Sequence, residues 1–518
     1  MAKKFSNYED LITFTRASTG HALRPVSYGT ELVTNGTFDS DVSGWTETSA
    51  STSVSASGVE VTTTSTDKGG IVQSVSLTVG NTYVFSVDQS GANDAIVQIG
   101  SASFSGETYQ NTAVDGSLYF SFVADFSTTY ISLRVQNAAS GQSCTFDNVS
   151  VKEVLFDQPN GTLTLFEHPD NFPRVEYDAD RNRLVLLIEE SRTNLFTYSE
   201  KLSEKVENMS TSDNAAIAPD GNQTASFCRP TTFSTEHYID DSNVTSGTDY
   251  AMSCFAKQGP GDYLLAFRGS GIGSNPPRFN LETGTIDNTG SADWSNVKIE
   301  DVGNGWYRCS AVANPNNTTP LRFQITESGG TVAFAGDGTS GLYIWGCQIE
   351  QASFPTSYIK TTGSTATRSA DYPIDISWDN FGYNKRAGTF VVEFDHTDPD
   401  NSDTNYLLSG GGSARFFYNN AGTSVWSVYD GAGMSVSGVP SDGTPLKISV
   451  AMSDAGTTVH LNGTLNSSSP SITPQDSISY NTLNIGGVSA VTALNGHIKS
   501  IKYYPRRLTN VQLQELTT

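Results

Sequence analysis

Cysteine, positive charge and long apolar runs are all scarce in this sequence of 518 residues. The cysteines are odd in number, and none belongs to a Cys-x-x-Cys pair or a Cys/His cluster. This pattern argues against a disulfide framework and against a structural zinc site. We therefore expect every cysteine to be a small buried hydrophobic residue. They are Cys144, Cys228, Cys254, Cys309 and Cys347.

Basic residues number 30 against 54 acidic ones, which gives a formal net charge of −24. Phosphate backbones and anionic lipid surfaces would repel such a chain, so we expect no nucleic-acid partner. No apolar run approaches the ~18–20 residues that span a bilayer, and the first residues lack the apolar core of a signal peptide. We expect no membrane insertion, and synthesis in the cytoplasm.

Hydrophobic residues make up 36% and charged residues 16%, and glycine alone contributes 47 positions. This composition suits short strands and many turns, and it is typical of extracellular adhesins. An adhesin without a signal peptide or disulfides is most simply a virion protein, made in the host cytoplasm and released by lysis. At ~150 residues per domain, the length predicts three or four domains.

Strand periodicity recurs through most of the chain. In residues 82–87 the larger side chains Tyr83, Phe85 and Val87 alternate, as in a half-buried antiparallel strand. Asn462-Gly463 favours a type I′ hairpin turn. The one helix that we predict lies in residues 505–516, where Thr509 and Gln512 have the spacing of a capping box. We predict an all-β protein.

An internal duplication is the most informative feature of the sequence. It predicts that residues 31–154 and 194–351 are two copies of one β-sandwich, with Cys254 and Cys347 at the core positions of Val87 and Val149. The matched segments are 80–87 with 247–254, 118–119 with 306–307, 133–136 with 321–324, and 146–151 with 344–349.

Three parts of the chain carry family resemblances. Residues 31–39, Gly44-Trp45 and residues 146–149 resemble the jelly-roll domains of the carbohydrate-binding-module superfamily. Residues 187–196, 344–350 and 354–358 resemble a module that is common in tailed-bacteriophage structural and tail-fibre proteins. Residues 388–394, 447–450, 459–463 and 496–504 resemble a lectin-like concanavalin or laminin-G sandwich.

The phage module usually follows a short leader, whose two pieces here match residues 12–19 and 172–178. The first sandwich would then be inserted into the leader, so we expect residues 1–30 to pack with residues 155–193. The predicted domains follow from this insertion. They are a platform made of residues 1–30 and 155–193, an inserted jelly roll (31–154), a second jelly roll with an extended connector (194–371), and a lectin-like sandwich with a C-terminal helix (372–518).

Motifs of catalysis are absent from the sequence. It contains no nucleophile elbow, phosphate loop or HExxH, and its histidines are scattered. Glu189 and Glu190 are adjacent, so on a strand they would point to opposite faces and could not flank one glycosidic bond. We expect no enzyme activity, although distant carboxylates could still assemble a glycosidase site in three dimensions.

The resemblance to carbohydrate-binding modules implies a structural calcium near the first and last strands of the jelly roll. Asp39 and Asp147 are the matching residues, whereas the second copy has Trp345 in place of Asp147. The acidic loop at residues 395–403 lacks the pattern of an EF-hand and is better explained as a solvated loop. No other cofactor is expected.

Aromatic residues beside turns are the candidates for stacking on sugars. They are Trp45, Trp294, Trp426 and Tyr429, and for each of them a core position is the alternative. Trp306 and Trp345 lie in the matched strands, and we expect both in the core.

These features predict a bacteriophage virion protein, a tail fibre or spike-like adhesin, that binds host-surface polysaccharide. The platform would attach it to other virion proteins, and analogy with phage fibres implies a homotrimer. Two alternatives stay open. One is a structural head-decoration, head-fibre or tail component that binds only other virion proteins, and the other is a polysaccharide depolymerase.

Overall fold

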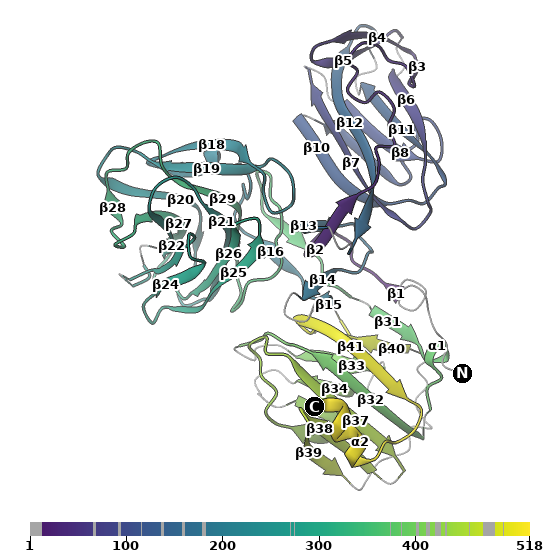
Figure 1. The fold of residues 1–518 in the computed structure, drawn as a ribbon, viewed down its shortest axis with the longest axis vertical. Helices are drawn as coiled ribbons and strands as arrows, with labels where there is room; N and C mark the ends of the chain where they lie inside the picture. The colour runs from purple at the N-terminus through teal and green to yellow at the C-terminus, as the bar shows by residue number, and fades with distance from the viewer. Residues whose placement is uncertain are drawn as a thin grey trace. The chain divides into compact units, whose positions relative to one another are not determined.

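The computed structural model contains strands in almost every part that it describes, with two short α-helices (Figure 1). The all-β prediction is therefore confirmed. The described residues are 13–65, 69–91, 95–114, 116–135, 139–157, 161–178, 183–269, 271–273, 275–372, 374–384, 386–399, 404–410, 415–419, 426–429, 433–454, 456–469, 482–489 and 492–518.

The chain divides into two compact units. One unit comprises Arg24–Leu163 and Glu167–Pro169 and holds the first sandwich. The other comprises Met1–Leu23, Thr164–Phe166 and Asp170–Thr518, and it holds the second sandwich and the C-terminal sandwich. No helix in the described ranges is long and apolar enough to cross a bilayer.

The first sandwich packs two antiparallel sheets around a core that includes Phe38, Phe85 and Phe146. The C-terminal end of β12 also pairs with β2 (Gly20–Tyr28), which neighbours β13 (Thr162–His168). One sheet has the order β4 (Ala50–Ser55), β5 (Gly58–Thr63), β12 (Ser143–Phe156), β7 (Thr82–Ser90), β10 (Gly116–Val123), and the other β3 (Thr46–Thr48), β6 (Gly70–Ser76), β11 (Thr128–Val135), β8 (Ala95–Gly100), β9 (Tyr109–Val114).

The second sandwich has the same plan, with a core that includes Phe196, Phe267 and Phe323. A 3₁₀ turn, η1 (Leu202–Glu204), precedes it, and β16 (Arg192–Asn194) pairs with β30 (Ala366–Arg368). One sheet has the order β18 (Met209–Ala216), β19 (Ala225–Pro230), β29 (Leu342–Glu350), β21 (Tyr250–Gln258), β26 (Trp306–Ala313), β25 (Trp294–Gly303). The other sheet has the order β17 (Val206–Glu207), β20 (Thr235–Val244), β27 (Thr319–Glu327), β22 (Tyr263–Gly269), β23 (Pro277–Asn280), β24 (Thr285–Thr289), and β28 (Ala333–Phe334) also pairs with β20.

The two sandwiches share strand order and local detail. The order β10-β7-β12 in the first corresponds to β26-β21-β29 in the second, and β6-β11-β8 corresponds to β20-β27-β22. The hydroxyl oxygen of Tyr83 accepts the N–H of Thr78 at 2.9 Å, and that of Tyr250 accepts the N–H of Thr245 at 3.1 Å. Each matched pair of strands, β7 with β12 and β21 with β29, also contains a bulge at the same position.

One matched pair of segments was out of register. The sequence pairs Leu118-Tyr119 with Trp306-Tyr307, but the sheet places Tyr119 opposite Ser86 and Ser310 opposite Ser253. Because Ser86 and Ser253 are themselves equivalent, Tyr119 corresponds to Ser310, and the sequence match is wrong by three residues. An odd shift moves every side chain to the other face of a strand, which a sequence match cannot detect.

The C-terminal sandwich contains two seven-stranded sheets around a core that includes Phe394, Trp426 and Ile188. One sheet has the order β1 (Thr13–Phe14), β31 (Ile374–Ser377), β40 (Thr482–Ile485), β33 (Asn405–Ser409), β34 (Arg415–Asn419), β35 (Trp426–Tyr429), β36 (Gly433–Val436), and the other β14 (Val175–Asp178), β15 (Arg183–Ile188), β41 (Gly496–Tyr504), β32 (Ala387–Phe394), β37 (Leu446–Ser453), β38 (Gly456–Leu461), β39 (Thr464–Ser469).

Local sequence signals in this sandwich are confirmed. Asn462 and Gly463 both have positive φ, 45° and 77°, in the turn between β38 and β39. Helix α2 (Asn510–Thr517) begins after Thr509, which forms the predicted capping box with Gln512. A shorter helix, α1 (Trp378–Phe381), follows β31.

The platform strands belong to the sheets of the C-terminal sandwich. β1 pairs with β31, and β15 pairs with β41. The two platform pieces also contact each other, because the backbone N–H of Arg16 donates to the Asn171 side chain at 3.2 Å and that of Leu23 donates to the Glu176 carboxylate at 3.2 Å. The platform strands therefore extend the C-terminal sheets and do not form a layer of their own.

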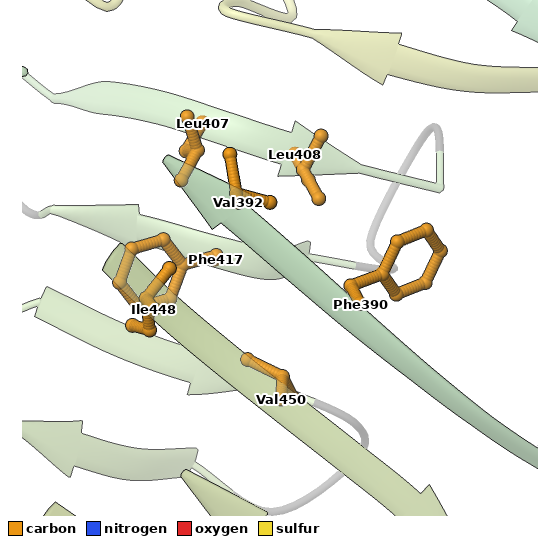
Figure 2. A pocket seen from close by; sticks show the side chains of 7 residues that line it. All are labelled: Phe390, Val392, Leu407, Leu408, Phe417, Ile448 and Val450. Atoms are coloured by element: carbon orange, nitrogen blue, oxygen red, sulfur yellow. The ribbon is translucent and has the colours of Figure 1, made fainter. Parts of the chain in front are cut away.

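Figure 2 shows a small gap between the two sheets of the C-terminal sandwich. Its volume is about 10 Å³, close to the smallest space that holds one water molecule. All of its lining side chains are apolar, so a water there would find no hydrogen-bond partner. The gap is part of the core; its lining residues are Phe390, Val392, Leu407, Leu408, Phe417, Ile448 and Val450.

Candidate functional site

The tryptophans proposed for sugar stacking are buried. Trp45, Trp294 and Trp426 are 7%, 6% and 2% exposed, so none presents a ring face to a ligand. Trp45 packs against Phe38, Trp294 lies in the core of the second sandwich, and Trp426 stacks on Phe417 at 4.8 Å. The stacking prediction is wrong for these three residues, because the face on which a turn leaves a side chain is set by sheet packing.

The fourth stacking candidate, Tyr429, has its backbone in β35, opposite Gly433. Its side chain lies outside the described part of the structure. The core predictions are confirmed, because Trp306, Trp345 and all the cysteines are buried, the cysteines as free thiols.

The two residues matched to a calcium site are hydrogen bonded locally. The Asp39 carboxylate accepts from the Thr37 hydroxyl at 3.0 Å, and the Asp147 carboxylate accepts from the Asn148 N–H at 2.8 Å. Within the described ranges, no group of three or more His, Cys, Asp or Glu residues is placed to hold a metal ion. The calcium site stays a prediction.

A cleft of about 250 Å³ lies within the larger unit, where the second sandwich, the platform strands and the C-terminal sandwich meet. This volume holds more than one water molecule and is slightly below the ~300 Å³ at which typical small-ligand pockets begin. The lining residues are Glu176, Leu187, Glu189, Asn296, Lys298, Glu300, Arg308, Ser310, Phe354, Pro355, Ser357, Asp395, Thr397, Pro399, Ser441, Asp442, Asn495, Gly496 and His497.

Strand alternation places the polar side chains of β26 in the cleft wall. Cys309 and Ala311 face the core of the second sandwich, so Arg308 and Ser310 point to the opposite face of the sheet. Asn495 immediately precedes β41 and has a φ of 53°, in the left-handed region that Asn tolerates better than most residues. Its side-chain oxygen accepts the N–H of Glu190 at 2.9 Å, whereas its amide nitrogen has no hydrogen-bond partner among the described residues.

Three buried polar atoms in the cleft wall have no hydrogen-bond partner in the described part of the protein. They are Oγ of Ser310, Nε of Arg308 and Nδ2 of Asn495. Ser310 and Asn495 are only 1% and 3% exposed. Because most buried polar groups are normally paired, a polar ligand or ordered water in the cleft is a candidate partner for these three atoms.

His497 lies between two carboxylates at the floor of the cleft. Its Nδ1 is 2.9 Å from Asp395 and its Nε2 is 2.9 Å from Glu176, while Lys499 contacts the other Asp395 oxygen at 3.2 Å. Burial alone would lower the pKa of His497, but the hydrogen bonds and charges of Asp395 and Glu176 raise it to about 10. The ring is therefore protonated at neutral pH, and both of its N–H groups are used.

The Glu189 carboxylate, also at the cleft floor, is likewise occupied by hydrogen bonds and ion pairs. Its carboxylate accepts the N–H and hydroxyl of Ser357 at 2.8 and 2.6 Å and forms ion pairs with Arg174 and Arg368 at 2.7 and 3.3 Å. Burial by itself would raise the pKa of Glu189, but the two guanidinium groups and Ser357 hold it well below its usual range. Arg174 also pairs with the buried Asp371, so this network braces the cleft floor.

Sequence reasoning did not find this cleft, because none of its residues belongs to a recognisable motif. One sequence difference between the two copies points to the cleft, but the three-residue error in their alignment obscured it. With the register corrected, the second copy has Ser310 where the first copy has Tyr119, a change from a large side chain to a small one in the cleft wall.

No protein-family model matches the chain, and no curated protein matches it. Among solved structures, Trypanosoma rangeli sialidase is similar at 10% identity and a TM-score of 0.24, over 91% of this chain and 83% of that one.

Two further solved structures are similar. An N-terminal tandem of CBM22 domains from Paenibacillus barcinonensis matches at 12% identity and a TM-score of 0.20, over 63% of this chain and 98% of that one. A putative carbohydrate binding protein from Bacteroides ovatus matches at 10% identity and a TM-score of 0.21, over 62% of this chain and 84% of that one. At such scores the likenesses carry no argument. The fold and the cleft define the chain as a multi-domain β-sandwich protein with a polar cleft in its larger unit.

Proposed function

We propose that this protein is a bacteriophage virion adhesin, fibre-like or spike-like, that binds host-surface glycan in the cleft of its larger unit. The observation that carries the proposal is the set of unpaired buried atoms of Ser310, Arg308 and Asn495 around a cleft of ligand size. Sugar hydroxyls supply the oxygen acceptors that these atoms require. The composition, rich in glycine and poor in charged residues, is typical of adhesins and supports this setting.

The platform attaches the chain to other virion proteins, and assembly as a trimer multiplies the number of clefts on one particle. Multiple weak sites on one particle act together, because each bound site raises the effective concentration of the others. A single cleft therefore needs only modest affinity for firm attachment.

Competition for adsorption tests the proposal. Host cells are saturated with the purified protein, and the rate of phage attachment is then measured. The unmodified protein is expected to slow attachment, and Ser310→Ala to slow it clearly less, because it lacks one ligand hydrogen bond. Removing an unpaired buried hydroxyl is neutral or stabilising for the fold itself.

Ser449→Ala is the matched control. Ser449 lies in β37, is fully buried, and also has a hydroxyl without a partner among the described residues, but it is not part of the cleft. It should compete as well as the unmodified protein. Unchanged attachment with folded, unmodified protein would contradict the adhesin proposal and favour the alternative, a structural virion component that binds only other virion proteins.

A polysaccharide depolymerase is the second candidate, favoured by two carboxylates, Glu176 and Asp395, beside His497 in an open cleft. Glycosidases need one carboxylic acid with a raised pKa. Although burial acts to raise it, the bonds from His497 hold the pKa of Asp395 below its usual value, and hydrogen bonds from Thr444 lower that of Asp442. Release of new reducing ends from host polysaccharide would establish the depolymerase and replace the adhesin proposal.

A further inference from the structure

The unpaired atoms of the cleft have one chemical character. Nε of Arg308 and Nδ2 of Asn495 are donors only, and the Ser310 hydroxyl both donates and accepts. A ligand that fits them must therefore bring acceptor oxygens. Hydroxyl, ring and carboxylate oxygens all meet this need, so charge has to decide among them.

The cleft is poorly equipped to hold a carboxylate. Its lining contains five acidic side chains against three cationic ones, in a chain with a net charge of −24. The basic side chain with an unpaired buried atom is Arg308, and a carboxylate binds arginine best through two parallel N–H bonds. One nitrogen that serves in such a fork, Nη2, already donates to the carbonyl oxygen of Thr356, which weakens a two-bond contact with a carboxylate.

The carboxylates at the cleft floor already have cationic partners, so they do not pair with a cationic group of a ligand. Glu176 and Asp395 are paired with His497, and Glu189 is paired with Arg174 and Arg368. Glu300 and Asp442 also line the cleft, and both are exposed to solvent. A ligand hydroxyl group can hydrogen bond with the donors and with the exposed carboxylates of the cleft. It accepts from Ser310 or Arg308, and it donates to an exposed carboxylate.

We infer that the cleft binds an uncharged, hydroxyl-rich saccharide, a single sugar or a short chain end, in preference to uronic or sialic acids. This inference rests on the proposed function and specifies its ligand class. It follows from the arrangement of donors and carboxylates and needs no metal ion or cofactor.

Calorimetric titration of the full chain tests the inference with two probe sets. The neutral set contains tri- to hexasaccharides of glucan, mannan and galactan, and the acidic set contains oligogalacturonate and oligosialic acid of the same length. A neutral saccharide is expected to bind, with a Kd that changes less than about twofold between 50 and 500 mM NaCl, because no charge pair is screened.

Ser310→Ala should weaken neutral binding about fivefold to tenfold, and Ser449→Ala should leave it unchanged. Thermal melts of both variants establish that they are folded. Tighter binding of an acidic saccharide, with a strong salt dependence, would overturn the inference and leave the glycan-binding proposal in place. Binding of neither set would overturn both, and neutral binding unaffected by Ser310→Ala would place the saccharide outside this cleft.

Discussion

Ion pairs between buried side chains hold the larger unit together. Arg16 and Arg174 both pair with Asp371, and all three side chains are fully buried. Arg16 comes from the first platform piece, Arg174 from the second, and Asp371 from the end of the connector. Burial would raise the pKa of Asp371, but the two arginines hold it below its usual value. Breaking such a buried pair typically costs about 3–5 kcal/mol, because the remaining charge is left without a partner.

His497 gives the larger unit a dependence on pH that can be measured. The raised pKa of about 10 means that folded His497 keeps a proton which the unfolded chain releases near pH 6.5. The folded state therefore binds more protons, and the free energy of unfolding falls as pH rises from about 6.5 towards 10. This stabilisation is fully present below pH 6.5.

Urea unfolding at intervals between pH 6.5 and 7.5 measures this slope below the pKa of about 8.5 at which cysteines titrate in the unfolded chain. His497→Gln should lower stability at pH 6.5 and flatten the slope, since glutamine carries no titrating proton between Asp395, Glu176 and Lys499. Equal slopes for the variant and the unmodified protein would show that His497 is not protonated in the folded state.

At the scale of elements, the same bulge in both sandwiches is made by different residues. Asn148 has a φ of 53° in the first copy, and Gly346 has a φ of 64° in the second. A Cβ built on Gly346 would lie 3.0 Å from the ring of Phe255, whereas Asn148 is exposed. The bulge therefore requires a left-handed residue in both copies but requires the absence of a side chain only in the second.

Alanine at these two positions should separate the two effects. Gly346→Ala combines a left-handed backbone with a crowded Cβ and should lower the free energy of unfolding by about 1–3 kcal/mol. Asn148→Gly should change it by less than about 1 kcal/mol, and Asn148→Ala should cost the backbone term and the exposed hydrogen bond from Asn148 to Asp88, without a crowded Cβ. Chemical denaturation monitored by tryptophan fluorescence gives all three values, and equal losses for Gly346→Ala and Asn148→Ala would contradict the steric argument.

At the scale of the whole molecule, the C-terminal sandwich depends on residues far earlier in the chain. β1 and β15 are paired with its two sheets, and Ile188 lies in its core. The predicted domain of residues 372–518 lacks all of these strands. Without them the edges of β31 and β41 would be open to solvent and to aggregation.

The isolated fragment 372–518 is therefore expected to be unstable or to aggregate. The comparison is a chain in which residues 31–154 are replaced by a short glycine-serine linker, which keeps both platform pieces and removes the inserted sandwich. This chain should melt cooperatively, as measured by circular dichroism. A fragment 372–518 that melts at the same temperature would show that the platform strands are dispensable.

Local sequence patterns predicted the elements well. The cysteines are buried, as their apolar character predicts. The strand class, the Asn462-Gly463 hairpin and the capping box at Thr509 are also confirmed, because each depends on neighbours within a few residues. Stacking residues failed for the opposite reason. Whether Trp45 or Trp426 faces solvent depends on which sheet face meets another sheet, and that is not a local property.

The sequence by itself determined that this protein is built from β-sandwiches, that one of them is duplicated, and that its surface is acidic. Only the tertiary structure decided where a ligand could bind. The cleft joins residues such as Glu176 and His497, which are 321 positions apart, and its unpaired donors come from β26 and from Asn495 before β41, which meet only after folding. Periodicity records which face of a strand is buried, but the pairing of distant strands depends on the packing of the whole core.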